Sequence, residues 1–189
     1  MQVVLDDYTQ GAVLATELAN TSPTVWVVAG DRLTDIEAVQ SLLDDNDVRS
    51  SAPTGTHDLE QVRALRDRLR DILDAPAPAE LITLTHDALS VVPHRIELTE
   101  IDGEWRWQAA TEKDCSLADE LTVLTGYALL GTVRALGIER FRACASPTCN
   151  GVFVDVSRGG RRRYCMPGLC GNRINVANHR QRRRSPGEA

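Results

Sequence analysis

The chain has 189 residues, of which 42% are hydrophobic and 4% aromatic, and its formal net charge is −6. This length suits one ordinary domain with a small appendage and excludes two large hydrophobic cores. The charge is uneven, because residues 1–139 carry a net −15 and residues 140–189 carry +9, with arginine as the basic residue throughout the second span. The sequence therefore predicts an acidic body followed by a basic module.

Several classes of protein are disfavoured by the sequence. No apolar run approaches the roughly 18–20 residues that cross a bilayer, and the N-terminus lacks the pattern of a secretory signal. We therefore expect a cytoplasmic protein without membrane contact, in which cysteines serve as metal ligands or redox groups. Nucleotide-binding, nucleophile-elbow and metalloprotease motifs are missing, and the histidines are scattered, so we expect no enzymatic activity.

The first half of the chain predicts helices. Apolar residues recur at helical spacing over residues 7–20, and Thr34 to Glu37 has the pattern of a capping box that starts a helix ending near Leu43. Between them, residues 24–29 form a short apolar run that fits either a strand or a buried connector. The polar residues 44–57 predict an exposed loop.

Three further helices are expected. Residues 58–74 have one apolar face and one face of arginine and aspartate, which we interpret as a solvated surface of ion pairs. A short helix is predicted for about residues 80–90. The longest helix is predicted for residues 117–136, with a cap at Ser116 and a terminating glycine at Gly137.

A β-hairpin is predicted between the last two of these helices. Apolar and polar residues alternate over residues 94–99, Asp102 and Gly103 mark a turn, and the alternation returns at Trp105 and Trp107. The two tryptophans share one face of their strand, and we expect them to cover the helical core rather than to stack on a ligand.

The strongest chemical signal is the spacing of Cys144, Cys149, Cys165 and Cys170. Two close pairs separated by a spacer of hairpin length are typical of a tetrahedral four-cysteine zinc site. The spacer predicts a strand over residues 151–156, a turn at 158–160 and a return over 161–164. Four thiolates fill the coordination shell, so we expect one structural zinc ion and not a catalytic one. Two disulfides would need an oxidising compartment, and a thiol redox switch remains an alternative.

The residues around the last cysteine resemble the CGNR zinc-finger family of bacterial proteins. The resemblance rests on Cys170, Gly171, Asn172 and Arg173, preceded by the arginine-rich stretch that leads to Cys165. The early helix, the helix after residue 58 and the long helix before the cysteines are similar to the ABATE-type domain that precedes this finger. The motifs are specific over residues 142–184.

The resemblance implies a transcriptional regulator in which the finger binds DNA and the ABATE-type domain senses a small ligand or a stress signal. The stretch after Arg173 departs from the family, because Ile174 to Asn178 is less basic than is usual there, and this weakens the expectation of DNA binding. Two or three arginines beside Cys165, such as Arg161 to Arg163, would offset the negative charge of a four-thiolate zinc site. This does not account for all eleven arginines of residues 140–189, so those of the finger are the expected DNA contacts. These candidates are Arg158, Arg161, Arg162, Arg163, Arg173, Arg180, Arg182, Arg183 and Arg184.

The sequence as a whole predicts an α+β protein in three parts. Residues 1–139 form a mostly helical, ABATE-like sensor domain with a β-hairpin, residues 140–184 a treble-clef-like zinc finger whose last cysteine begins a helix, and residues 185–189 a frayed tail. The leading hypothesis is a zinc-dependent DNA-binding regulator, and the alternative is a zinc-stabilised protein-interaction module that does not bind DNA. A small-molecule effector and a homodimer are further expected partners, and the sequence identifies neither.

Overall fold

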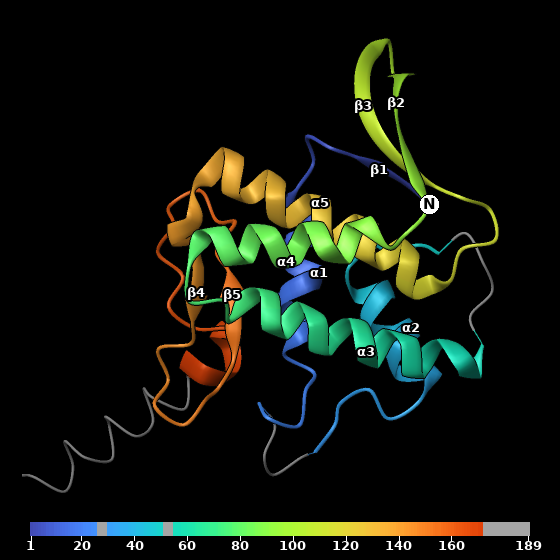
Figure 1. The fold of residues 1–189 in the computed structure, drawn as a ribbon. Coiled ribbons are helices and arrows are strands. Elements are labelled where there is room, and N and C mark those ends of the chain that lie inside the picture. Colours follow the sequence, from blue (N-terminus) through green and yellow to red (C-terminus); the bar gives the residue numbers. More distant parts are fainter. Residues whose placement is uncertain (26–29, 51–54, 172–189) are drawn as a thin grey trace, which may run out of the picture.

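The computed structural model describes residues 1–25, 30–50 and 55–171 of the chain. Its helices form a layered body with a two-stranded projection at one end and the cysteine-rich module at the other (Figure 1). The described part contains five α-helices: α1 (Thr9–Ala19), α2 (Ile36–Asp45), α3 (Thr56–Leu73), α4 (Pro78–Ser90) and α5 (Leu117–Leu136). The prediction of an α+β fold is confirmed, because small antiparallel sheets accompany these helices.

Helix α5 is the central element of the body. It packs against α1, α3 and α4, and its residues from Leu117 to Thr132 are largely buried. Two glycines permit close helix contacts: a Cβ on Gly11 of α1 would lie 2.6 Å from the Ala128 Cβ, and one on Gly126 would lie 2.9 Å from the Leu89 side chain. The predicted cap is confirmed, since Ser116 Oγ accepts a hydrogen bond from the Asp119 backbone N–H.

The helix ends of the first half differ slightly from the prediction. The N-cap of α2 is Asp35 and not Thr34, because the Asp35 carboxylate accepts from the Ala38 N–H while the Thr34 hydroxyl donates to that carboxylate. Aspartate and threonine are both good caps, so adjacent candidates are decided by backbone geometry. Most of residues 24–29, the undecided strand or connector, lies outside the described residues.

The polar face of α3 is less solvated than expected. The Arg66 side chain is only 6% exposed and its guanidinium donates to both oxygens of Asp31, at 2.7 and 2.8 Å. Arg63 donates to the Leu33 carbonyl from the same face. The prediction of a solvated surface is therefore wrong for Arg66, whereas Arg63 is 28% exposed and pairs with Glu60. Both arginines hold the segment before α2 against α3.

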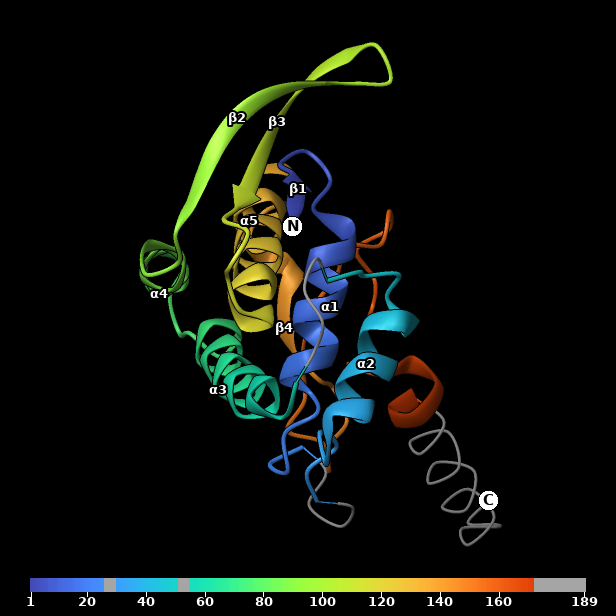
Figure 2. The same cartoon turned by 90° about the vertical axis from the view of Figure 1, so that its right-hand side faces the viewer.

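The predicted hairpin is confirmed and is longer than expected. Strands β2 (His94–Ile101) and β3 (Glu104–Thr111) pair in antiparallel register, and a third strand, β1 (Gln2–Val4), pairs with the end of β3 at Gln108 to Ala110. The outer part of the hairpin stands clear of the helices in both ribbon views (Figure 2).

The tryptophans of the hairpin do not cover the helical core. Trp105 is 67% exposed and Trp107 is 53% exposed. The expectation was wrong because the hairpin extends beyond the helices, so that only its inner end, Gln108 to Thr111, is buried.

The cysteine-rich module contains a second, two-stranded sheet. Strand β5 (Val152–Val154) pairs with β4 (Phe141–Ala143), which follows a short 3₁₀ turn, η1 (Ile138–Arg140). The predicted strand is confirmed, but its partner lies before the first cysteine and not in the return segment 161–164. The return segment is held instead by the side chains of Asp155 and Arg142.

Candidate metal centre

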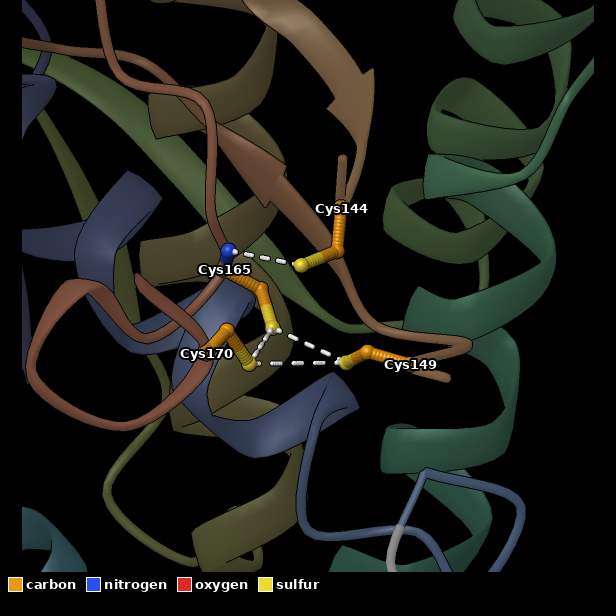
Figure 3. A group of neighbouring side chains, drawn as sticks. All are labelled: Cys144, Cys149, Cys165 and Cys170. Carbon is orange, nitrogen blue, oxygen red and sulfur yellow. Dashed lines mark hydrogen bonds between the residues drawn. The ribbon is translucent and has the colours of Figure 1, made fainter. Parts of the chain in front are cut away.

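Four sulfur atoms converge at the end of the body opposite the hairpin. The Cys149 Sγ lies 3.5 Å from the Cys165 Sγ and 3.7 Å from the Cys170 Sγ, and the last two sulfurs are 3.8 Å apart. All four Sγ atoms, including that of Cys144, lie within 4.8 Å of one another, and all four thiols are free (Figure 3). A tetrahedral zinc ion with Zn–S bonds of about 2.3 Å requires sulfurs about 3.8 Å apart. The geometry fits, and these cysteines form the site of one structural zinc ion.

The two cysteine loops are shaped by backbone donors and by a glycine. The Gly151 N–H points at the Cys149 Sγ at 3.3 Å, and the Cys165 N–H points at the Cys144 Sγ at 3.5 Å. A Cβ on Gly151 would overlap the Cys165 sulfur. Cys170 lies in a helical turn, η2 (Pro167–Gly171), which begins three residues before this cysteine. The helix expected to follow Cys170 falls on residues outside the described ranges.

The thiols differ in how readily they ionise without a metal. Burial and the neighbouring Cys149 thiol raise the pKa of Cys170 to about 11, and burial also raises the pKa of Cys165. Burial opposes ionisation of Cys144 too, but the backbone N–H groups of Cys165 and Ser146 hold its pKa below the usual value. A bound Zn²⁺ deprotonates its thiol ligands outright, so the ion supplies the charge that makes four close thiolates stable.

Strand β5 connects the metal centre to the helical body. Its side chains point alternately into two clusters. Val152 and Val154 belong to the main hydrophobic core, and Phe153 packs in a smaller cluster with Cys165 and Cys170. The strand is therefore buried on both faces, between the helices and the zinc site.

The free edge of β5 is hydrogen-bonded to side chains of α1. Thr16 Oγ1 accepts from the Val154 N–H at 3.0 Å. One turn later, Asn20 accepts from the Val152 N–H through Oδ1 at 3.0 Å and donates to the Val152 carbonyl through Nδ2 at 2.6 Å. We call Thr16 and Asn20 the α1 clamp, since they provide β5 with the partners that another strand would give.

Arg162 points inward and braces residues 155–166, the segment that follows β5 and contains Cys165, which we call the zinc loop. Its guanidinium donates to the backbone carbonyls of Tyr164 and Cys165 and lies over the Phe153 ring, 4.9 Å from the centroid. Burial lowers the pKa of this guanidinium. A cation at this position also offsets part of the charge of a zinc ion with four thiolates.

Asp155 organises the loop between β5 and Cys165. Its carboxylate is fully buried and accepts from the Ser157 N–H, the Ser157 hydroxyl and the Arg162 N–H. Arg142 of β4 lies 3.5 Å away from it and donates to the carbonyls of Gly160 and Arg162. Although burial opposes ionisation, the hydroxyl and backbone donors hold the pKa of Asp155 below its usual value. This carboxylate fixes the return segment, residues 161–164, that leads to Cys165.

The structure places three of the candidate DNA contacts on the surface of this loop, whereas a fourth, Arg162, points inward. Arg158, Arg161 and Arg163 are exposed, and Arg163 lies against the Tyr164 ring. Gly171 of the motif is the last residue that the structure describes and lies in η2. Asn172 of the motif and the other five candidate DNA contacts lie outside the described residues: Arg173, Arg180, Arg182, Arg183 and Arg184.

Several residues that shape the site were not singled out from the sequence. Asp155 carried a signal, because it is the one acidic residue among residues 140–171 and follows a run of apolar residues. Gly151 carried a weaker one, as a glycine two residues after a ligand. Thr16 and Asn20 carried none, since their partners are more than 130 residues away.

The helices in the described ranges include none long and apolar enough to cross a membrane. In comparisons with protein families, the model of the CGNR zinc finger matches residues 140–183. The ABATE model, described as "Putative stress-induced transcription regulator", matches residues 12–137, more than half of the chain. A search of curated proteins found no match.

Proposed function

Because the chain belongs to the ABATE family and carries a CGNR zinc finger, we propose that it is a zinc-dependent, DNA-binding transcriptional regulator. In this proposal the finger contacts the DNA backbone and the helical body senses a small ligand or a stress signal. Neither family description names a catalytic activity, and the four-cysteine site has no open position for one.

The observation that carries the proposal is the charge of the zinc-anchored loop. Arg158, Arg161 and Arg163 are exposed, whereas Asp155, the one acidic residue among residues 140–171, is fully buried. The loop is fixed at both ends, by the Asp155 carboxylate and by Cys165. Arginines on a rigid loop lose less conformational freedom when they bind phosphates than arginines on a flexible one.

The proposal is tested by selecting duplexes from genomic fragments with the zinc-loaded chain and measuring their affinity by fluorescence anisotropy. We expect the triple variant Arg158→Gln, Arg161→Gln, Arg163→Gln to bind the selected duplex at least about 30-fold more weakly, since each lost phosphate contact costs on the order of 1 kcal/mol.

A matched control removes the same charge elsewhere. Arg49, Arg68 and Arg95 are also exposed, and lie outside the finger. The variant with glutamine at these three positions should keep nearly the wild-type affinity. Equal losses in both triple variants would mean that net charge, and not this loop, determines binding, and failure to recover any duplex would contradict the proposal.

The sensing part of the proposal is best placed at a cavity of about 240 Å³ beside the metal centre. Glu17, Arg32 and Leu42 from the helical body line it together with Cys165 and Met166 from the zinc loop. A ligand here would contact both parts of the molecule, so its binding energy would be coupled to the position of the zinc loop.

This part is tested with a small-molecule library in a thermal-shift assay. Compounds that bind the cavity should raise the Tm of the wild type but not that of Leu42→Trp, a variant that fills the cavity from α2. Compounds that stabilise both chains equally bind elsewhere and would contradict this location.

A further inference from the structure

The outer part of the β2–β3 hairpin, residues 96–107, carries an uncovered apolar face; we call this segment the arm. The antiparallel register pairs Leu98 with Trp107 and Glu100 with Trp105, so these side chains share one face with Ile96. Ile96 is 44%, Leu98 48%, Trp107 53% and Trp105 67% exposed. The other face is polar, with ion pairs between Arg95 and Glu97 and between Glu104 and Arg106.

Among the described residues, few contacts support the arm. Strand β1 pairs with β3 only at residues 108–110, followed by a bond from the Leu5 N–H to the Trp107 carbonyl. An isolated two-stranded hairpin with an open apolar face is marginally stable in water, and a large exposed apolar patch commonly marks an interaction site.

An apolar groove begins where the arm ends. Its volume is about 310 Å³, and its apolar lining comes from Trp107 of the arm, from Leu5, and from Tyr127, Leu130 and Gly131 along α5, with the charged Asp6 and Arg134 at its edge. The apolar face of the arm and the groove thus form one continuous surface that meets at Trp107.

We propose that this surface is a homodimer interface, in which the arm of each copy packs into the groove of the other. A two-fold interface needs a self-complementary surface, and this chain supplies both the projecting arm and the receiving groove. The charges are compatible with this arrangement: Glu100 lies on the apolar face of the arm, and Arg134, 72% exposed and paired with Asp6 at 3.2 Å, lies at the rim of the groove. An exposed pair of this kind contributes little, so Arg134 can exchange Asp6 for Glu100 of a second copy at small cost.

The area available is adequate for a stable dimer. From the exposed fractions, the four apolar side chains of the arm offer on the order of 450 Å². The groove and the polar rim of each copy bring this toward the roughly 800 Å² per partner of a standard interface. The arm and the zinc finger lie at opposite ends of the body (Figures 1 and 2).

The test is sedimentation velocity of the full-length, zinc-loaded chain between about 1 and 100 µM, at the lower end of which a dimer of micromolar Kd would begin to dissociate. We expect a dimer of twice 20.7 kDa. Trp105→Glu should raise the dissociation constant at least about 30-fold, because a buried aromatic anchor is lost and a charge is placed in the interface. Thr99→Glu, which adds the same charge on the polar face of the arm, should leave it nearly unchanged.

A mixing experiment identifies the groove as the receiving surface. Leu130→Gln should also weaken the homodimer, while circular dichroism and zinc content show that each variant is folded. A mixture of Trp105→Glu and Leu130→Gln chains keeps one intact arm and one intact groove in each heterodimer, so it should associate more tightly than either variant alone. A wild-type chain that is monomeric at 100 µM, equal effects of Trp105→Glu and Thr99→Glu, or no gain on mixing would overturn the proposal.

Discussion

At the scale of single residues, the most informative ion pair of the helical body joins Asp31 to Arg66. Arg66 is almost fully buried in α3, whereas Asp31 is 28% exposed and also accepts from the Leu33 N–H. A buried guanidinium without its carboxylate would retain an uncompensated charge, so the pair is costly to break from one side. It fixes the segment that leads from α1 to α2 against α3.

We predict that Asp31→Asn lowers the free energy of unfolding by about 2 kcal/mol at pH 7, the cost of breaking a charge-assisted pair that water reaches in part. Burial opposes ionisation, but the bonds from Arg66 and Leu33 hold the pKa of Asp31 below its usual value. The unfolded chain therefore takes up a proton first as the pH falls, and the contribution of Asp31 is lost from about pH 4 downward.

The measurement is urea unfolding of the wild type and of Asp31→Asn at a series of pH values from 7 to 3. The two proteins are compared at each pH, so that any loss of zinc affects both alike. The difference in stability should shrink at the acidic end. Asp67→Asn is the control, because Asp67 contacts the same arginine but is 66% exposed, and its effect should be small. A difference between wild type and Asp31→Asn that does not change with pH would contradict this assignment.

The zinc ligands could be predicted from the sequence, and the residues that hold them in place could not. The four cysteines could be recognised as ligands from their spacing, because the geometry of a metal site restricts the lengths of the loops that carry its ligands. Arg162 could be recognised as part of an arginine cluster, but its sequence does not distinguish a brace on backbone carbonyls from a phosphate contact. The distinction depends on the direction in which the loop turns. The buried Asp155 fixes that direction by accepting from the Arg162 N–H, and the Arg162 side chain then reaches the Tyr164 carbonyl.

At the scale of elements, strand β5 is the connection between the helical body and the zinc finger. It has three residues, and its pairing with β4 is supplemented by the α1 clamp, Thr16 and Asn20. Because the strand is buried on both faces, any of its backbone groups that lost a partner would have no water to replace it.

Asn20→Ala should therefore lower the free energy of unfolding by about 2–3 kcal/mol, because the buried N–H and carbonyl of Val152 each lose a partner. Urea unfolding followed by circular dichroism measures this effect. Thr9→Ala, an exposed position at the start of the same helix, is the control and should change stability little. Equal stability of Asn20→Ala and wild type would show that the clamp is not needed to hold β5.

Long, strongly patterned elements were predictable, and among the three-residue strands only β5 was, because it lies inside a longer alternating run, residues 151–156. The helix α5 and the β2–β3 hairpin followed from their periodicity and from the residues that cap or turn the chain at Ser116 and Asp102–Gly103. Strands β1 and β4 have three residues each, too few for an alternation to be recognised. The exposure of Trp105 could not be predicted either, since alternation tells which residues share a face but not whether anything covers it.

At the scale of the whole molecule, the finger and the helices share one hydrophobic core. Val152 and Val154 of the finger lie in the same cluster as the helices of residues 12–137, and Phe153 between them faces the zinc site. Loss of zinc should consequently weaken the packing of the helical body as well as that of the finger.

We predict one zinc ion per chain, a marked fall in Tm on chelation, and a similar fall in Cys149→Ser, because three thiolates bind zinc less tightly than four. Cys115→Ser is the matched control, since Cys115 lies outside the four-sulfur cluster. It should keep both the zinc and the Tm of the wild type. Metal analysis and calorimetry give the two readouts, and full zinc content in Cys149→Ser would contradict the assignment of the ligands.

The central claim is that a zinc-organised, arginine-rich surface binds the phosphates of DNA. Its most direct measurement is the affinity of the zinc-loaded chain for a selected duplex across a series of salt concentrations. If about five or six arginines contact phosphates, the logarithm of the binding constant should fall with the logarithm of the salt concentration at a slope near −5, and chelation should abolish binding. A slope near zero, or equal affinity of the zinc-loaded and chelated chains, would contradict the claim.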